Sequence, residues 1–235
     1  MSDFYSVCET DISGDKRTDF INPYVVKCVI LGDTSVGKST LIHLFTQEKP
    51  PEKIVTTIGI DLLSKNMKIS LPSEERIQHI KLQLWDTAGQ ASFLIKSYAR
   101  DMHLAIIMFD ISNRQTWLSL DLWKDNLITE YPFLPHIVLV GTKSDLSRRE
   151  ITSTEIQEKA DKWGCRSYIL SAVQDNSLSM VKRMFQIAIE DLHRTLQYQA
   201  DQKNKLPPGF LTKDEKIGIK LKDGLERIRP SCCGN

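Results

Sequence analysis

Residues 32–40, GDTSVGKST, have the types and spacing of a phosphate-binding loop, G-x-x-x-x-G-K-[ST]. Gly32 and Gly37 have no β-carbon, so the backbone between them can curl closely around a phosphate. Successive backbone N–H groups, backed by a helix N-terminus, would then point at the anion. Lys38 would place its ammonium on the terminal phosphates, and Ser39 would offer its hydroxyl to Mg²⁺. The residues expected to contact phosphate are Asp33, Thr34, Ser35, Val36, Gly37, Lys38, Ser39 and Thr40.

The segments on either side of this loop supply the setting that it requires. Residues 25–31 are apolar and rich in β-branched side chains, which predicts a strand. Residues 40–45 carry an apolar face, which predicts a helix. The eight-residue pattern alone leaves a chance glycine turn before a helix as an alternative. The order of strand, loop and helix favours a phosphate site.

The rest of the chain alternates apolar runs with helical patterns, which is typical of βαβ units. Residues 48–58 contain two prolines and no regular period, which predicts a loop. We expect an antiparallel hairpin from residues 60–70 and 77–85. Thr152 and Glu155 have the spacing of a capping box that opens a helix. Further strands are predicted at residues 104–109, 137–140 and 168–170, and further helices at residues 115–130, 152–163 and 178–199.

These elements predict an α/β fold of the P-loop NTPase type, a three-layer sandwich. Its mixed, mostly parallel sheet would have about six strands, flanked by about five helices. Ligands of such sheets bind outside the carboxyl ends of the strands. The phosphate-binding loop is therefore expected at that edge of the sheet.

Composition excludes several classes of protein. Apolar residues make up 41% and charged residues 26% of the 235, which is ordinary for a globular domain. The formal net charge of +1 argues against nucleic acid as the main partner. No apolar run reaches about 18 residues, so no transmembrane helix is expected. The five cysteines form neither a disulfide framework nor a zinc pattern, which favours a reducing cytosol.

The two ends of the chain differ from the middle. Residues 1–23 are polar and acidic, and we expect a mostly disordered extension without a secretory signal. Ser2 stands where N-myristoylation requires glycine. Residues 200–235 are charged and irregular, and they end in Cys232 and Cys233. Between these ends, residues 24–199 are expected to form one nucleotide-binding domain.

The order of motifs resembles that of the Ras superfamily of small GTPases. After the phosphate-binding loop come a loop threonine, an Asp-x-x-Gly-Gln motif, a Thr-Lys-x-Asp motif and a Ser-Ala pair, each in the expected place. The segments WDTAGQ at 85–90 and TIGID at 57–61, with the paired cysteines at the end, resemble the Rab branch. The resemblance covers about residues 24–194 and the terminus.

This resemblance implies roles around the phosphates. Thr57 would ligate Mg²⁺ through its hydroxyl and sense the γ-phosphate. Asp86 would hold the Mg²⁺ shell, and Gly89 would donate a backbone N–H to the γ-phosphate. Gln90 would orient the attacking water, with Lys38 and Thr57 completing the catalytic set. Mg²⁺ is the implied cofactor, with Ser39, Thr57 and Asp86 as its ligands.

The resemblance also implies a guanine site. The carboxylate of Asp145 would accept hydrogen bonds from guanine N1–H and the exocyclic amine, and the stem of Lys143 would lie along the base. The loop holding Ser171 and Ala172 would cap guanine O6 with a backbone N–H. The full guanine set comprises Thr142, Lys143, Asp145, Ser171, Ala172 and Val173. This set favours GTP over the ATPase or nucleotide kinase that a phosphate-binding loop alone would permit.

Several positions depart from the family pattern. Thr142 stands where asparagine is usual, and Val173 where lysine often follows Ser-Ala. Pro50 replaces an aromatic residue that covers guanine in Rab proteins, which predicts faster nucleotide exchange. Residues 91–92 are Ala-Ser instead of Glu-Arg, and the second switch is shorter than usual. These last changes fall in the segment that regulators and effectors would contact.

The terminal cysteines Cys232 and Cys233 resemble a Rab double geranylgeranylation site. Two lipid chains with a modestly basic tail would anchor the chain stably, where a single chain is marginal. The resemblance implies prenyltransferase, escort and GDP-dissociation-inhibitor partners for this tail. It places the protein in the cytoplasm and on the cytoplasmic face of intracellular membranes. The alternative is a pair of unmodified thiols.

The predicted function is a Rab-like GTPase that acts as a monomeric molecular switch in vesicle and protein transport. GTP with Mg²⁺ would order residues 48–61 and 86–101, and hydrolysis to GDP and phosphate would release them. An exchange factor, a GTPase-activating protein and effectors would bind these switch regions. A GTP-binding scaffold with negligible hydrolysis is an alternative that the altered second switch raises.

Overall fold

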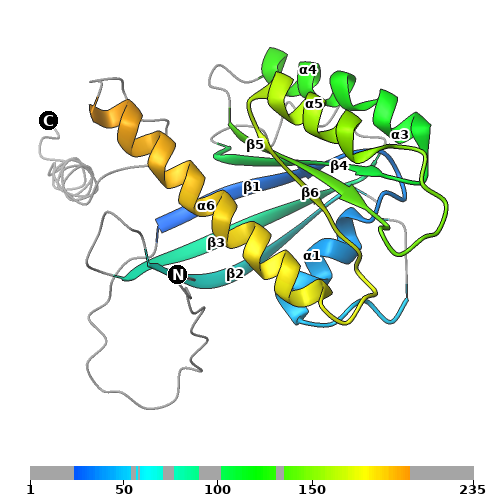
Figure 1. Cartoon of the computed structure of the whole chain (residues 1–235). Coiled ribbons are helices and arrows are strands. Elements are labelled where there is room, and N and C mark those ends of the chain that lie inside the picture. The colour runs from blue at the N-terminus through cyan, green and yellow to red at the C-terminus, as the bar shows by residue number, and fades with distance from the viewer. Residues whose placement is uncertain are drawn as a thin grey trace, which may run out of the picture.

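The computed structural model describes residues 24–53, 57, 59–70, 77–89, 102–130 and 135–201. These residues contain one six-stranded sheet in the order β2-β3-β1-β4-β5-β6 (Figure 1). Its strands are β1 (Tyr24–Leu31), β2 (Ile60–Ser70), β3 (Ile77–Thr87), β4 (Leu104–Asp110), β5 (His136–Thr142) and β6 (Arg166–Ile169). All neighbours are parallel except β2 and β3. The predicted mixed, mostly parallel sheet is confirmed.

Helices cover both faces of this sheet, as Figure 1 shows. They are α1 (Lys38–Gln47), α3 (Arg114–Leu118), α4 (Leu120–Glu130), α5 (Ser153–Trp163) and α6 (Ser177–Asp201). The helices α1 and α6 pack together on one face, where the rings of Phe45 and Phe185 stack with centroids 4.0 Å apart. On the other face, α3, α4 and α5 enclose a second core. The three-layer α/β sandwich is therefore the fold of the described part of the chain.

The β2–β3 edge of the sheet is partly exposed to solvent and its centre is buried, and the pattern of apolar residues in the strands differs accordingly. In β3 the side chains of Ile80, Leu82 and Leu84 are buried while their neighbours are partly exposed. This alternation suits the edge hairpin that β3 forms with β2. Strand β4 is buried at every position, as expected for a central parallel strand with a helix layer on each face. The carboxyl ends of these central parallel strands therefore lie together at one edge of the sheet.

Two predicted elements differ in detail. The helix expected at residues 115–130 is divided into α3 and α4 at Ser119, whose hydroxyl donates to the Gln115 carbonyl. The Ser119 N–H donates to the same carbonyl at 3.2 Å and the Trp123 N–H donates to the Ser119 carbonyl at 3.1 Å, so helical hydrogen bonds continue across the division. The last strand covers Arg166–Ile169 instead of 168–170, and the N–H of Leu170, just beyond it, still donates to the Gly141 carbonyl of β5 at 2.8 Å.

The start of α5 agrees with its sequence signature. Thr152 Oγ1 accepts the Glu155 N–H at 3.2 Å, and Glu155 Oε2 accepts the Thr152 N–H at 2.8 Å, so the predicted capping box is present. Gly164 ends the helix in the left-handed conformation. The expected N-terminal extension, residues 1–23, lies outside the described residues, as does the tail beyond Asp201.

Candidate functional site

The phosphate-binding loop joins β1 to α1 at the carboxyl edge of the sheet. Gly32 has φ 138, and a β-carbon there would lie 2.3 Å from the Met108 carbonyl oxygen of β4, so only glycine fits. Gly37 is the N-cap of α1, and no side chain caps this helix. The N–H groups of its first turn, which have no partner within a helix, are therefore available to an anion.

Lys38 lies inside this loop and is 5% exposed. Its Nζ donates to the carbonyl oxygens of Gly32 and Asp33, each at 2.8 Å. Burial lowers the pKa of Lys38 to about 8, against the opposing charges of Asp86 and Asp33. The ammonium is thus held at the centre of the loop, where a phosphate would lie.

The carboxylate of Asp33 engages a helix on the other side of the loop. Its Oδ1 accepts a 2.7 Å hydrogen bond from Trp123 Nε1 of α4. The main chain of Asp33 therefore belongs to the loop while its side chain fastens the loop to α4. Sequence reasoning missed Trp123, because an indole in an amphipathic helix normally indicates core packing.

Ser39, Thr57 and Asp86, the predicted metal ligands, meet in what we call the metal corner. The hydroxyls of Ser39 and Thr57 lie 2.5 Å apart, and Thr57 Oγ1 donates to Asp86 Oδ2 at 3.3 Å. Asp86 is 3% exposed, and its Oδ1 accepts no hydrogen bond from the residues that the structure describes. Burial raises the pKa of Asp86 and outweighs the hydrogen bond from Ser39 and the charge of Lys38.

This donor set fits Mg²⁺. Two hydroxyl oxygens and Asp86 Oδ2 converge, and the other oxygen of that carboxylate, Oδ1, is buried and unsatisfied among the described residues, so a cation would neutralise it. Mg²⁺ in nucleotide sites is bound by one or two carboxylates, with phosphates and waters completing the octahedron. Within the described ranges no group of three or more His, Cys, Asp and Glu side chains could hold a metal by itself. The corner therefore suits a cation that arrives with phosphate.

Gly89 approaches the phosphate-binding loop more closely than any side chain would allow. A β-carbon on Gly89 would lie 2.2 Å from the backbone nitrogen of Thr34. The preceding residue, Ala88, is held by a 3.0 Å hydrogen bond from its N–H to the Gly59 carbonyl. The segment after β3 thus touches both the loop and the start of β2. Gln90, the predicted catalytic residue, lies outside the described residues.

The predicted guanine residues meet beyond β5 and β6. Ser171 Oγ donates to Asp145 Oδ1 at 2.6 Å and accepts the Val173 N–H at 3.1 Å. The turn 171–173 is therefore tied to the carboxylate that would read the base. Ala172 packs against the core, whereas the Val173 side chain is exposed and the backbone N–H of Val173 donates to Ser171.

Thr142 links the base side of the site to the phosphate side. Its hydroxyl lies 2.6 Å from the Val36 carbonyl oxygen and 2.9 Å from that of Phe109, and it can donate to either. Val36 belongs to the phosphate-binding loop, and Phe109 belongs to β4. A threonine at this position, where asparagine is usual, therefore still bonds the loop to the sheet.

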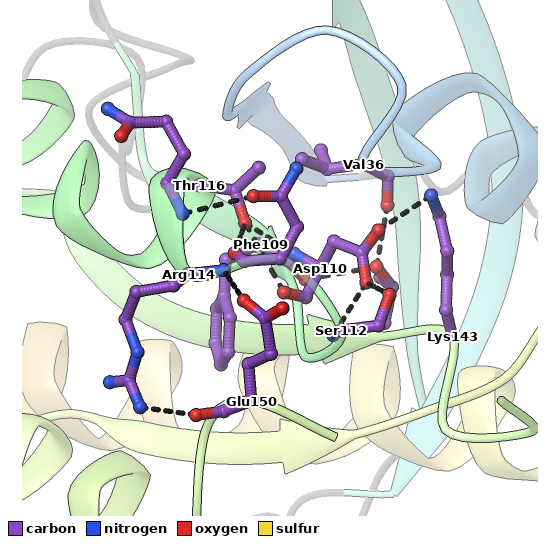
Figure 2. Close-up of polar contacts among 11 residues, drawn as sticks. Val36, Phe109, Asp110, Ser112, Arg114, Thr116, Lys143 and Glu150 are labelled. Carbon is purple, nitrogen blue, oxygen red and sulfur yellow. Dashed lines mark hydrogen bonds and ion pairs between the residues drawn. The ribbon is translucent and has the colours of Figure 1, made fainter. Parts of the chain in front are cut away.

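Lys143 forms an ion pair that the sequence did not reveal. Figure 2 draws this pair between Lys143 and Asp110, and the distance from Lys143 Nζ to Asp110 Oδ2 is 2.7 Å. Asp110 ends β4, and its register partner in β5 is Thr142. We call Thr142, Lys143, Asp145 and Ser171, together with Asp110, the base corner. The signal for Asp110 was an acidic residue at the carboxyl end of an otherwise apolar strand.

The structure brings the described site residues together along one edge of the sheet. The phosphate-binding loop, the metal corner and the base corner follow β1, β3, β5 and β6 at their carboxyl ends. Three predicted site residues lie outside the described residues, namely Gln90, Cys232 and Cys233. No helix in the described ranges is long and apolar enough to cross a membrane.

Comparison with known proteins finds a match over most of the chain. The Ras family model matches residues 27–194. The chain is 36% identical to the human Ras-related protein Rab-27B over 163 residues, which cover 66% of this chain and 75% of that protein. It is 36% identical to the Ras-related protein Rab-27A of Rattus norvegicus over 169 residues, which cover 68% of this chain and 76% of that protein.

Proposed function

This chain belongs to the Ras family as a Rab-like small GTPase, and from that premise we propose that it is a Mg²⁺-dependent GTP switch in vesicle traffic. The proposed reaction is slow hydrolysis of GTP to GDP and phosphate. The observation that carries the proposal is the 2.6 Å bond from Ser171 to Asp145, at the same edge of the sheet as the phosphate-binding loop. A fixed carboxylate there suits the donor edge of guanine and not that of adenine.

Guanine recognition would use the Asp145 carboxylate and the backbone of the 171–173 turn. Asp145 would accept the guanine N1–H and exocyclic amine, while Ser171 keeps its carboxylate oriented. The backbone of the 171–173 turn would donate to guanine O6. The stem of Lys143 would cover one face of the base. Each of these groups is fixed by a backbone or side-chain contact before the nucleotide arrives, which reduces the entropy lost on binding.

Mg²⁺ would be held by Ser39, Thr57 and Asp86 together with the phosphates. When bound, the ion supplies charge stabilisation to the transferring phosphoryl group. Asp86 contributes the buried carboxylate oxygen that is unsatisfied among the described residues. Lys38, enclosed by the loop, would contact the terminal phosphates, and the open N–H groups of α1 would add further donors.

Hydrolysis would depend on positioning and on charge. Gln90 would orient the attacking water, and the Gly89 N–H would donate to the γ-phosphate. The close approach of Gly89 to Thr34 supports this role, because it places that backbone beside the phosphate-binding loop. Thr57 would sense the γ-phosphate through its hydroxyl. Loss of the γ-phosphate would release residues 48–61 and 86–101.

Regulators would act on these two switch regions. An exchange factor, a GTPase-activating protein and effectors would bind residues 48–61 and 86–101. Cys232 and Cys233 would carry geranylgeranyl groups, and prenyltransferase, escort and GDP-dissociation-inhibitor-type proteins would bind the tail. The protein would then move, as a monomer, between the cytoplasm and the cytoplasmic face of intracellular membranes.

A scaffold that binds GTP without hydrolysing it is the competing proposal. Ala91 and Ser92, directly after Gln90, favour it because they change the segment that would hold the catalytic glutamine. The two proposals share every binding residue and differ only in turnover.

The experiment measures affinity for GTP, GDP and ATP with Mg²⁺, then single-turnover GTP hydrolysis by wild type and Gln90→Leu. Tight guanine binding with slow turnover that Gln90→Leu abolishes supports the switch. Guanine binding without turnover, identical in both proteins, supports the scaffold. Preference for ATP overturns the guanine assignment. Asp145→Ala is the control for the base, because it should weaken GTP and GDP binding while leaving the phosphate-binding loop intact.

A further inference from the structure

We infer that Asp110 is a positioning residue for nucleotide binding, which acts by holding the ammonium of Lys143 in place. This inference rests on the proposed guanine-binding role of Lys143 and extends it to a residue in the neighbouring strand. The ion pair between Asp110 Oδ2 and Lys143 Nζ measures 2.7 Å. Asp110 itself is not expected to touch the nucleotide.

Asp110 is a buried residue of the sheet whose side chain and backbone are both hydrogen-bonded. It ends the fully buried strand β4 and is 5% exposed. Its Oδ1 accepts two hydrogen bonds from Ser112, from the backbone N–H at 2.8 Å and from the hydroxyl at 2.6 Å. Its own backbone N–H donates to Thr116 Oγ1 at 3.0 Å. With Oδ1 satisfied by Ser112, the carboxylate presents Oδ2 to Lys143 in one orientation (Figure 2).

The carboxylate is also kept ionised. Burial acts to raise the pKa of Asp110, but the hydrogen bonds from Lys143 and Ser112 outweigh it and hold that pKa below its ordinary value. A buried charge in such a position is tolerated only when it is paired. Asp110 therefore presents a permanent negative charge to Lys143 at neutral pH.

Lys143 is fixed at both ends of its side chain. Its backbone lies in the left-handed region, φ 61, directly after the buried Thr142. A residue other than glycine adopts this conformation only when its surroundings impose it. Asp110 then fixes the ammonium, so the four-carbon stem spans two defined points. A lysine side chain held in this way loses less conformational entropy when a base covers it.

The two loops that carry the pair are fastened to each other. The Ile111 carbonyl accepts the N–H groups of Glu150 and Ile151 at 2.9 and 3.2 Å. The Arg114 N–H donates to Glu150 Oε2 at 2.7 Å, also drawn in Figure 2. The loop after β4 and the loop after β5 therefore move as one unit. Asp110 and Lys143 keep their separation because their supports are joined.

The ammonium retains donors for a ligand. A lysine ammonium has three N–H donors, and the pair with Asp110 uses one. The Lys143 side chain is 37% exposed, so it is reachable from the base corner while Asp110 is not. Loss of the Asp110 charge would free the lysine to sample other rotamers, and nucleotide release would become faster.

The test compares GDP release from the full chain for wild type, Asp110→Asn and Asp121→Asn. Asp110→Asn should release GDP about tenfold faster, because a hydrogen bond between charged groups is lost. Asp121→Asn is the matched control: it removes an Asp–Lys pair of 2.8 Å, with Lys159, that lies outside the site. Its release rate should stay within about twofold of wild type. An unchanged rate in Asp110→Asn overturns the inference, and so does a slower one.

A second arm separates positioning from general loosening of the fold. Lys143→Met keeps an unbranched stem without the charge. If Asp110 acts through Lys143, adding Asp110→Asn to Lys143→Met changes GDP release by less than about twofold. Equal effects in both backgrounds show a merely structural role and overturn the inference. Wild type that binds no guanine nucleotide overturns the proposed function together with this inference, whereas binding with an unaffected Asp110→Asn overturns this inference alone.

Discussion

The base corner and the metal corner lie at the same edge of the sheet, yet they differ in how far their polar groups are satisfied. In the base corner, Asp110 bonds Lys143, and Asp145 bonds Ser171, at 2.7 and 2.6 Å. In the metal corner, Asp86 keeps one buried oxygen that no described residue satisfies. Each carboxylate of the base corner has a partner within the protein, whereas the carboxylate of the metal corner keeps a buried oxygen that a ligand could satisfy.

The pKa values differ in the same sense. The pKa of Asp110 lies below its ordinary value because its hydrogen bonds outweigh burial. The pKa of Asp86 lies above its ordinary value because burial outweighs its hydrogen bonds. An ionised carboxylate whose pKa is raised by burial makes the folded state less stable. A cation bound to that carboxylate offsets this loss of stability. The base corner should therefore contribute constant affinity, while the metal corner makes affinity depend on the ion.

The largest expected effect comes from breaking the metal corner. Chelation of Mg²⁺ should accelerate GDP release by about 100-fold, because the ion contributes several kcal/mol of charge stabilisation to the phosphates. Asp86→Asn should accelerate release in Mg²⁺ to a similar extent. The measurement is GDP release with and without chelator.

Thermal unfolding of Asp86→Asn provides a control, because the effect on stability should have opposite signs without and with nucleotide. Without nucleotide, Asp86→Asn should be more stable than wild type, because it removes a buried charge with a raised pKa. With GDP and Mg²⁺ it should be less stable. A variant that is destabilised in both states contradicts the view that Asp86 is held for a cation.

A smaller effect on GDP release should follow from adding an aromatic ring that covers the base. Pro50→Phe restores an aromatic ring where Rab proteins cover the guanine, and it should slow GDP release by about tenfold, since stacking a base on an aromatic ring contributes about 1–3 kcal/mol. Pro50 is exposed in the structure, so the ring meets no core residue. Pro50→Leu serves as the control that adds bulk without a π face. Equal slowing by both variants would assign the effect to bulk.

Local pattern was sufficient for much of the site. The phosphate-binding loop, the capping box at Thr152 and the hairpin were predictable because each depends on residues that are neighbours in sequence. Asp110 and Trp123 were not, because their partners come from other elements. Trp123 and Asp33 are 90 positions apart, and only the packing of α4 on the sheet brings them together.

The elements show the same division. Strand β4 was predictable from its unbroken apolar run, whereas no proline or glycine in the sequence marks the division between α3 and α4 at Ser119. The roles of all the predicted site residues stay predictions, and Gln90 and the terminal cysteines in addition lie outside the described ranges.

A modest effect should come from the bond that fastens the phosphate-binding loop to α4. Trp123→Phe removes the donor to Asp33 and should lower the free energy of unfolding by about 1 kcal/mol, a decrease in melting temperature of about 2–4 °C. GDP release should rise about two- to fivefold, because the loop loses one support. In the Trp123→Phe background, Asp33→Ala should add little further destabilisation. Additive losses would show that the two side chains act separately.

The smallest effect concerns strain in the phosphate-binding loop itself. Ser35 has φ 64, a left-handed conformation that L-residues adopt at a cost and that glycine adopts freely. Ser35→Gly should therefore raise the free energy of unfolding by about 0.5 kcal/mol, since relief of strain slightly exceeds the added entropy of the unfolded chain. Ser119→Gly is the matched control, because Ser119 has φ −72 and the same replacement there should destabilise the protein. Chemical denaturation of both variants measures the difference. Stabilisation by neither variant would show that the backbone of Ser35 is not strained, and stabilisation by both would assign the effect to glycine itself and not to the left-handed conformation of Ser35.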